Sequence, residues 1–143
     1  MNRKLIIIRG TSGSGKSTLA AELYQSFYSQ NIPVEHFETD RYFVNSDGIY
    51  NFDYSKLGSY HSLCQSDTKK ALEDDKVVIV SNTFTTLREL KSYFLIAQKL
   101  NIIPIVYHCQ NEFKDIHNVP EEVLINQKKR FQYDISSLFE IFN

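Results

Sequence analysis

The chain has 143 residues, of which 42% are hydrophobic and 23% are charged, so its composition predicts one globular domain over residues 1–143. No apolar run approaches the roughly 18 residues of a membrane span, and the short apolar start reads as a first strand rather than a signal peptide. The net charge of −1 argues against a broad surface that coats nucleic acid, although it allows a small groove for a few nucleotides.

Strand-like and helix-like segments alternate along the first half of the chain. The apolar run Leu5–Arg9 predicts a strand, and apolar residues at intervals of four predict a helix from Lys16 to about Gln30. A second strand over Val34–Glu38 ends at Thr39-Asp40. Residues 41–58 are polar and aromatic, with glycines, and predict a long loop that its aromatic residues keep ordered.

The second half of the chain continues this alternation. The predicted elements are, in order, a helix from about Tyr60 to the acidic residues 73–75, a strand over Val77–Val80, a helical stripe from Leu87 to Leu100, a strand over Ile102–His108, and a helix near Pro120 with Asn118 as its cap. The run Val77–Val80 is apolar and β-branched, as in a central parallel strand, whereas Pro104 favours a position near an edge. We therefore expect an α/β fold with a parallel sheet, helices on both faces, and an apolar tail at 134–143 docked on the domain.

Residues 10–18, GTSGSGKST, fit the P-loop pattern G-x-x-x-x-G-K-[ST]. The expected nucleotide-binding residues are Gly10, Thr11, Ser12, Gly13, Ser14, Gly15, Lys16, Ser17 and Thr18. Glycines let backbone N–H groups converge on phosphate oxygens, Lys16 brings positive charge to the outer phosphates, and Ser17 offers a hydroxyl to Mg²⁺. Because a strand precedes the loop and a helix follows it, the phosphates would lie on a helix N-terminus, which argues against a plain glycine turn.

Ligands of parallel α/β sheets bind beyond the carboxyl ends of the strands. That rule brings together the P-loop, Asp40, residues 81–83 and the segment after His108. Asp40 fits a general base that accepts the proton of an attacking hydroxyl, and its position fits a cap of the following turn equally well. Lys114 fits a lid cation that stabilises charge in the transition state, or an ordinary surface lysine.

The neutral pair Ser81-Asn82 ends the Val77–Val80 strand, where an acid that organises Mg²⁺ is expected. Asp40 would then serve Mg²⁺ through water as well. Arg41 fits either an ion pair that lowers the pKa of Asp40 and weakens it as a base, or a grip on a substrate phosphate.

The two cysteines, Cys64 and Cys109, lie far apart and form no ligand motif. In a nucleotide-binding protein they indicate buried thiols of the reducing cytosol, so we expect a cytoplasmic protein.

Further segments follow the P-loop in a fixed order: TDRYF, DGIYNFDYSKLGSYHSLCQ, VIVSNTFTTLREL and IHNVPEEVLINQKKRFQ. Together with the P-loop they resemble the small AAA-type ATP-binding proteins of phages and bacteria, which in turn resemble the kinase domain of phage polynucleotide 5′-kinase. The resemblance runs from about Leu5 to Gln132. It implies an adenylate-kinase-like P-loop NTPase fold, ATP and Mg²⁺ as cofactors, and transfer of a phosphate to a hydroxyl acceptor, either a nucleic-acid 5′ end or a small molecule.

The resemblance also implies roles for single residues. Asp40 matches the general base of the polynucleotide kinase, and Lys114 matches its lid arginine, without the bidentate fork. The residues expected at the substrate are Arg41, Tyr42, His61 and Asn82.

This chain departs from the family pattern at two places, and each favours a different alternative. Phe43 replaces an arginine that grips substrate, which favours a kinase of a nucleoside, sugar or antibiotic. Ser81 replaces the leading acid of D-N-T-N, which favours a weakly active ATP-binding module that works through a protein partner.

Overall fold

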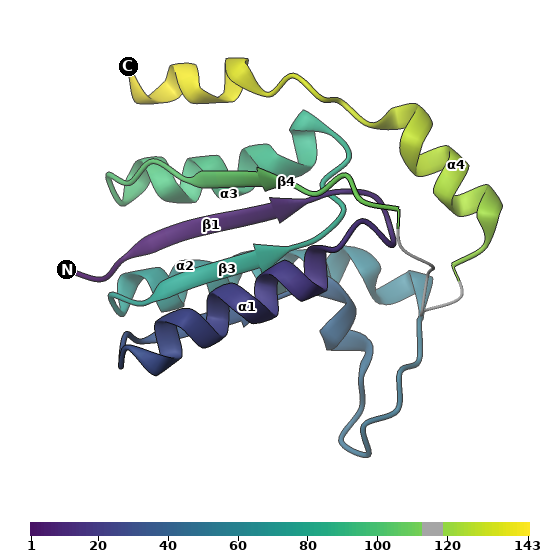
Figure 1. The fold of residues 1–143 in the computed structure, drawn as a ribbon, viewed down its shortest axis with the longest axis horizontal. Coiled ribbons are helices and arrows are strands. Elements are labelled where there is room, and N and C mark those ends of the chain that lie inside the picture. The colour runs from purple at the N-terminus through teal and green to yellow at the C-terminus, as the bar shows by residue number, and fades with distance from the viewer. Residues whose placement is uncertain (113–118) are drawn as a thin grey trace.

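The structure is a computed structural model that describes residues 1–112 and 119–143. Its strands and long helices are β1 (Lys4–Arg9), α1 (Lys16–Ser29), β2 (Val34–Phe37), α2 (Leu57–Glu73), β3 (Val77–Ser81), α3 (Leu87–Lys99), β4 (Ile105–His108) and α4 (Glu121–Arg130). Short 3-10 helices are η1 (Thr39–Phe43), η2 (Tyr54–Lys56) and η3 (Ser136–Phe142). The alternation predicted from the sequence is confirmed (Figure 1).

The strands form a parallel sheet in the order β2-β3-β1-β4. The central position predicted for the Val77–Val80 segment is confirmed, because β3 lies between β2 and β1. β4 is an edge strand of this sheet, as Pro104 indicates, but it begins only at Ile105, after the proline that cannot donate to a ladder. The register pairs Ile8 with Ser81, so β1 and β3 end side by side.

Helices cover both faces of the sheet, as expected. Alternating residues such as Ile6 and Ile79 pack with α1, while Ile7 and Val80 pack on the side of α2 and α3. The carboxyl ends of the strands therefore meet at the end of the sheet where α1 begins (Figure 1).

The segment predicted as a loop at 41–58 holds more regular structure than the sequence indicates. It contains part of η1, the whole of η2 and the first two residues of α2, so that Gly58 lies inside a helix. Phe43 packs against Tyr60 of α2 with ring centroids 4.7 Å apart, and also against Phe52 at 4.9 Å. This aromatic contact orders the segment, as its composition predicts, and draws it onto α2.

The C-terminal part of the chain packs back on the sheet and on α3. Pro120 is the N-cap of α4, whereas the expected cap, Asn118, lies outside the described residues. η3 packs on α3, where the rings of Phe94 and Phe139 meet edge to face at 5.0 Å. In residues 1–112 and 119–143, no helix is long and apolar enough to cross a membrane. Both cysteines are unbonded to each other; Cys64 is buried and Cys109 is partly exposed.

Candidate nucleotide-binding site

The P-loop begins where β1 ends, and Gly10 fixes its geometry. The amide of Gly10 donates to the carbonyl of Thr83 at 3.1 Å, which ties the loop to the end of β3. A Cβ atom on Gly10 would lie 2.4 Å from the Ser14 Oγ and 2.6 Å from the Cys109 carbonyl, and the φ of Gly10 is +155°. Any side chain at this position would collide with the loop, so the tight turn requires glycine.

The loop ends on the N-terminus of α1. Gly15, with a φ of +102°, precedes the helix, and the amide of Leu19 makes its first intrahelical bond, to the Gly15 carbonyl at 3.1 Å. The N–H groups of residues 16–18 therefore come before the helical ladder, and α1 has no capping side chain and no acid in its first turn. Such an end attracts an anion, so the residues present fit a phosphate chain.

Lys16 and Ser17 are the first two residues of α1. The Lys16 Nζ donates to the Thr11 carbonyl at 2.9 Å, so the ammonium group lies over the loop. Ser17 and Thr18 are exposed at the start of the helix, while Ser14 is buried within the turn. The Ser17 hydroxyl is an oxygen donor of the kind that Mg²⁺ prefers.

Helix α4 contacts the P-loop through Gln127, which the sequence reasoning did not single out. The Gln127 Oε1 accepts from the Ser12 amide at 2.9 Å, and its Nε2 donates to the Ser12 Oγ at 3.0 Å. Only 6% of Gln127 is exposed. A glutamine on the inward stripe of an amphipathic helix was the available signal, because a buried amide needs polar partners.

Arg9, the last residue of β1, was also missed. Its guanidinium donates to the Phe84 carbonyl at 2.7 Å and to the Gln132 carbonyl at 2.7 Å, and it lies 4.3 Å from the ring centroid of Phe131. The residue is 1% exposed, and this burial lowers its pKa from the usual value. A charged residue at the end of an apolar strand was the signal, since a buried arginine must find acceptors.

Asp40 lies in η1, one residue beyond a tether to the sheet. The amide of Thr39 donates to the Asn82 Oδ1 at 2.8 Å, and the next residue, Thr83, accepts from Gly10. The structure thus connects Asp40 to the P-loop through two hydrogen bonds. The side chain of Asp40 is exposed. The pKa of Tyr50 is raised mainly by the burial of Tyr50 and, to a smaller extent, by the negative charge of Asp40.

Two other residues predicted at the substrate, Tyr42 and His61, make contacts between η1 and α2. The Tyr42 hydroxyl donates to Asp67 of α2 at 2.6 Å, and the His61 Nδ1 lies 3.2 Å from the Thr39 Oγ1. Burial, followed by the bond to Asp67, raises the pKa of Tyr42.

Arg41 donates to the His36 carbonyl at 3.3 Å and makes no ion pair with Asp40 in the described part of the chain. The expectation of such a pair is wrong, because the side chain runs back along β2. Lys114, the expected lid cation, lies outside the described residues.

A polar cluster joins the ends of β2 and β3. The Ser81 Oγ donates to the Glu38 Oε2 at 2.8 Å, and the His36 Nε2 lies 2.6 Å from the same Ser81 oxygen and 3.5 Å from the Glu38 Oε2. Burial, with a smaller contribution from Arg41, lowers the pKa of His36 to about 4, so the ring is neutral near pH 7. The sequence reasoning placed Glu38 at a strand end without giving it a role.

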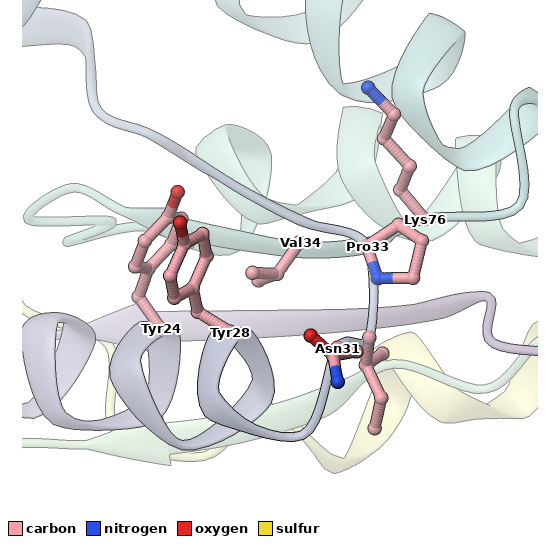
Figure 2. Close-up of a pocket in the computed structure, with 7 residues that line it drawn as sticks. Tyr24, Tyr28, Asn31, Pro33, Val34 and Lys76 are labelled. Carbon is pink, nitrogen blue, oxygen red and sulfur yellow. The ribbon is translucent and has the colours of Figure 1, made fainter.

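A separate hollow of about 410 Å³ lies at the opposite end of the sheet (Figure 2). Its lining residues are Tyr24, Tyr28, Asn31, Ile32, Pro33, Val34 and Lys76. The two tyrosine rings stack with centroids 6.1 Å apart, and Lys76 is paired with Glu35 at 3.2 Å. This hollow is remote from the P-loop.

A glycine loop between a parallel β-strand and a helix N-terminus defines the P-loop NTPase fold, here of the kinase-like type. Solved structures agree. Kti12 of Chaetomium thermophilum in complex with ADP-AlF3 matches 96% of this chain and 95% of its own, with a TM-score of 0.69 and 13% identity. The APS kinase CysC of Mycobacterium tuberculosis with AMPPNP and APS matches 77% and 64%, with a TM-score of 0.61 and 14% identity. Identities this low establish the fold alone.

The particular family follows from the sequence. The family model described as chromatin associated protein KTI12 matches residues 4–139, and the chain belongs to this family. The narrower expectation of a phage and bacterial AAA-type group is not supported. A fold relation to a polynucleotide kinase is supported. A chain of the Pnkp1/Rnl/Hen1 RNA repair complex matches 98% of this chain and 42% of its own length, with a TM-score of 0.59 and 19% identity.

Two curated relatives are similar in sequence. Uncharacterized protein PM0531 of Pasteurella multocida is 30% identical over 130 residues, which are 84% of this chain and 72% of the relative. NEDD4-binding protein 2 of Homo sapiens is 38% identical over 142 residues, which are 92% of this chain. The chain spans only 8% of that human protein, so the similarity covers one segment of a much longer molecule.

Proposed function

We propose that the protein binds ATP with Mg²⁺ and transfers the γ-phosphate to a hydroxyl group. The observation that carries this proposal is the position of Asp40. Its carboxylate is exposed one residue after Thr39, whose amide bonds Asn82, while the neighbouring Thr83 bonds Gly10 of the P-loop. A carboxylate and the glycine loop therefore share one end of the sheet, and this arrangement supports phosphoryl transfer with Asp40 as the base.

The chemistry divides among these residues. Gly13, Gly15 and the amides at the start of α1 hold the phosphates, and Lys16 neutralises charge on the outer ones. The Ser17 hydroxyl would be one ligand of a bound Mg²⁺, which would supply positive charge to the phosphate oxygens. The acceptor oxygen forms a bond to the γ-phosphorus, its proton passes to Asp40, and ADP leaves. Lys114 completes this proposal as a lid cation.

A polynucleotide 5′-hydroxyl is the acceptor that we favour. The fold relation to Pnkp1 supports this choice, and so does Arg41, an exposed cation beside Asp40 that suits an acceptor phosphate. Phe43 cannot take that role, because it is 4% exposed within an aromatic cluster. A small acceptor is the alternative if exposed rings such as Tyr50 and Phe52 form its site.

Labelled ATP tests this function when it is offered to 5′-hydroxyl oligonucleotides, to nucleosides and to buffer alone. We expect label on the oligonucleotide. Asp40→Asn should lower transfer about a hundredfold and leave ATP affinity intact, because it removes only the proton acceptor. Asp47→Asn, which changes another exposed acid in the segment that follows η1, is the matched control and should stay active.

Each contrary outcome is informative. Full transfer by Asp40→Asn would end the assignment of the base, and label on nucleosides alone would select a small-molecule kinase. Label on neither acceptor would favour a nucleotide-binding module that acts through a partner. The neutral residues at the end of β3 favour this binding module as a second candidate function, since Ser81 and Asn82 are both engaged in hydrogen bonds within the protein.

A further inference from the structure

We propose that Glu38 supplies the acid that is missing from the end of β3 and holds the Mg²⁺ of the bound nucleotide, through Ser81 as its positioning residue. This inference rests only on the nucleotide-binding part of the proposed function and is independent of phosphate transfer. It also gives two neighbouring acids different roles: Glu38 holds the metal ion, and Asp40 is needed only as the base.

The backbone places Glu38 on the face of the sheet that α1 covers. Val34 packs in the core under α1, and side chains alternate along a strand, so His36 and Glu38 point to the same face. Glu38 itself keeps an extended backbone, with φ −146° and ψ 140°, so the alternation continues past the end of β2. Ile79 of β3 also packs under α1, and alternation carries Ser81 to this face.

The carboxyl end of this face is the end at which α1 begins (Figure 1). Ser17, in the first turn of α1, is therefore on the same face and at the same end as Glu38. Ser81 pairs with Ile8 in the sheet, two residues before Gly10, which puts the Ser81–Glu38 contact beside the start of the P-loop.

The hydrogen bonds fix the orientation of the Glu38 carboxylate. The single proton of Ser81 goes to the Glu38 Oε2, so the His36 Nε2 must carry a proton and donate to the Ser81 oxygen. Oε2 is thereby occupied, whereas Oε1 accepts no hydrogen bond from any part of the chain that the structure describes. The side chain of Glu38 is only 22% exposed. A partly buried carboxylate with one neutral partner favours a nearby cation.

Mg²⁺ suits a single carboxylate of this kind. In nucleotide sites the ion keeps several waters and uses one or two carboxylates together with phosphate oxygens. Residues 1–112 and 119–143 contain no group of three or more His, Cys, Asp or Glu side chains that could hold a metal ion by itself. Asp40 is less suited, because it is exposed on η1 beside Tyr50.

Two binding measurements test the role of Glu38. Calorimetry compares ADP affinity in Mg²⁺ and in EDTA, and electron paramagnetic resonance follows Mn²⁺ that binds together with ADP. Glu38→Gln keeps an acceptor for Ser81 but removes the charge. We expect it to weaken Mn²⁺ binding at least about tenfold and to remove most of the gain in ADP affinity from Mg²⁺, with ADP affinity in EDTA unchanged.

Glu35→Gln is the matched control, because Glu35 lies on the same strand, points to the other face and pairs with Lys76. It should bind Mn²⁺ and ADP like the parent. If circular dichroism shows that Glu38→Gln is unfolded, Ser81→Ala takes its place, since it keeps the carboxylate and removes its orienting bond. Ser81→Ala should weaken Mn²⁺ binding about threefold, again without a change in EDTA.

Three outcomes would overturn the inference: unchanged Mn²⁺ binding by a folded Glu38→Gln, or by Ser81→Ala in its place; a loss of Mn²⁺ binding in Asp40→Asn instead; or a parent protein whose ADP affinity does not respond to Mg²⁺. A protein that loses Mn²⁺ in Glu38→Gln yet transfers phosphate to no acceptor would uphold the role of Glu38 and refute the proposed transferase. The two proposals therefore fail separately.

Discussion

The two ends of the sheet differ in what they offer a ligand. At the carboxyl end, a helix N-terminus, Lys16 and the polar residues that follow β2 and β3 lie around a tight glycine turn. The amino end has a hollow of about 410 Å³, walled by the stacked rings of Tyr24 and Tyr28 (Figure 2). Its charged residue, Lys76, pairs with Glu35.

This difference teaches that convergent donors, rather than the volume of a hollow, mark a site for phosphate. Parallel strands end together, and their helices begin there, so backbone N–H groups and polar side chains collect at the carboxyl end. The amino end collects helix C-termini and turns, which favour no anion. The following predictions test that contrast through changes at the carboxyl end, most of them paired with a control elsewhere.

The largest effect is expected for Arg9→Met. This change leaves the carbonyls of Phe84 and Gln132 without a buried donor, so the free energy of unfolding should fall by about 3 to 4 kcal/mol. Lys76→Met breaks only a partly exposed ion pair and should cost less than about 0.5 kcal/mol. Urea denaturation measures both, and equal losses would contradict the contrast between the two ends.

Lys16→Ala tests nucleotide binding directly. Loss of the charge that faces the outer phosphates should weaken ATP binding about a hundredfold or more in calorimetry. Lys76→Ala removes a lysine at the other end and should leave the dissociation constant within about twofold. An unchanged affinity in Lys16→Ala would refute the site, and with it every role that depends on the bound phosphates.

The pH dependence of stability tests the cluster at the end of β2. The folded pKa of His36 is about 4, below its unfolded value of about 6.5, so the unfolded chain binds more protons between these values. Stability should therefore be full above about pH 6.5 and fall as the pH drops toward 4, by about 3 kcal/mol. Urea titrations of the parent and of His36→Asn measure this slope, which should flatten in the variant.

The smallest effect is expected for Gln127→Ala, which removes both hydrogen bonds between α4 and Ser12. Stability should fall by about 1 to 2 kcal/mol, and ATP affinity should fall a few-fold because the loop loses its support. Gln98→Ala is the control, since the exposed Gln98 bonds the Ile141 carbonyl far from the loop. Equal ATP affinity in both variants would show that α4 does not support the P-loop.

The features that could be predicted from the sequence depend on local signals. Periodicity gave the alternation of strands and helices, the apolar run gave the central position of β3, and Pro104 indicated the edge. The P-loop could be placed because its glycines and Lys16 are adjacent in the chain and its conformation is a property of that segment alone.

The features that were missed depend on residues far apart in sequence. Ser12 and Gln127 are separated by 115 positions, Arg9 and Gln132 by 123, and Glu38 and Ser81 by 43. Each contact depends on how the strands and helices pack in the folded chain, so a local sequence pattern cannot predict it. The early start of α2 has the same origin, because Phe43 and Tyr60 meet only in the folded chain.

The paired hydrogen bonds between Ser12 and Gln127 have a consequence for the placement of α4. Because both the amide and the hydroxyl of Ser12 are satisfied by one side chain, α4 cannot move away without stranding two polar groups. The conformation of the turn and the placement of α4 are thus thermodynamically linked. Linkage is reciprocal, so whatever occupies the turn biases the helix, and whatever grips the helix alters the occupancy of the turn.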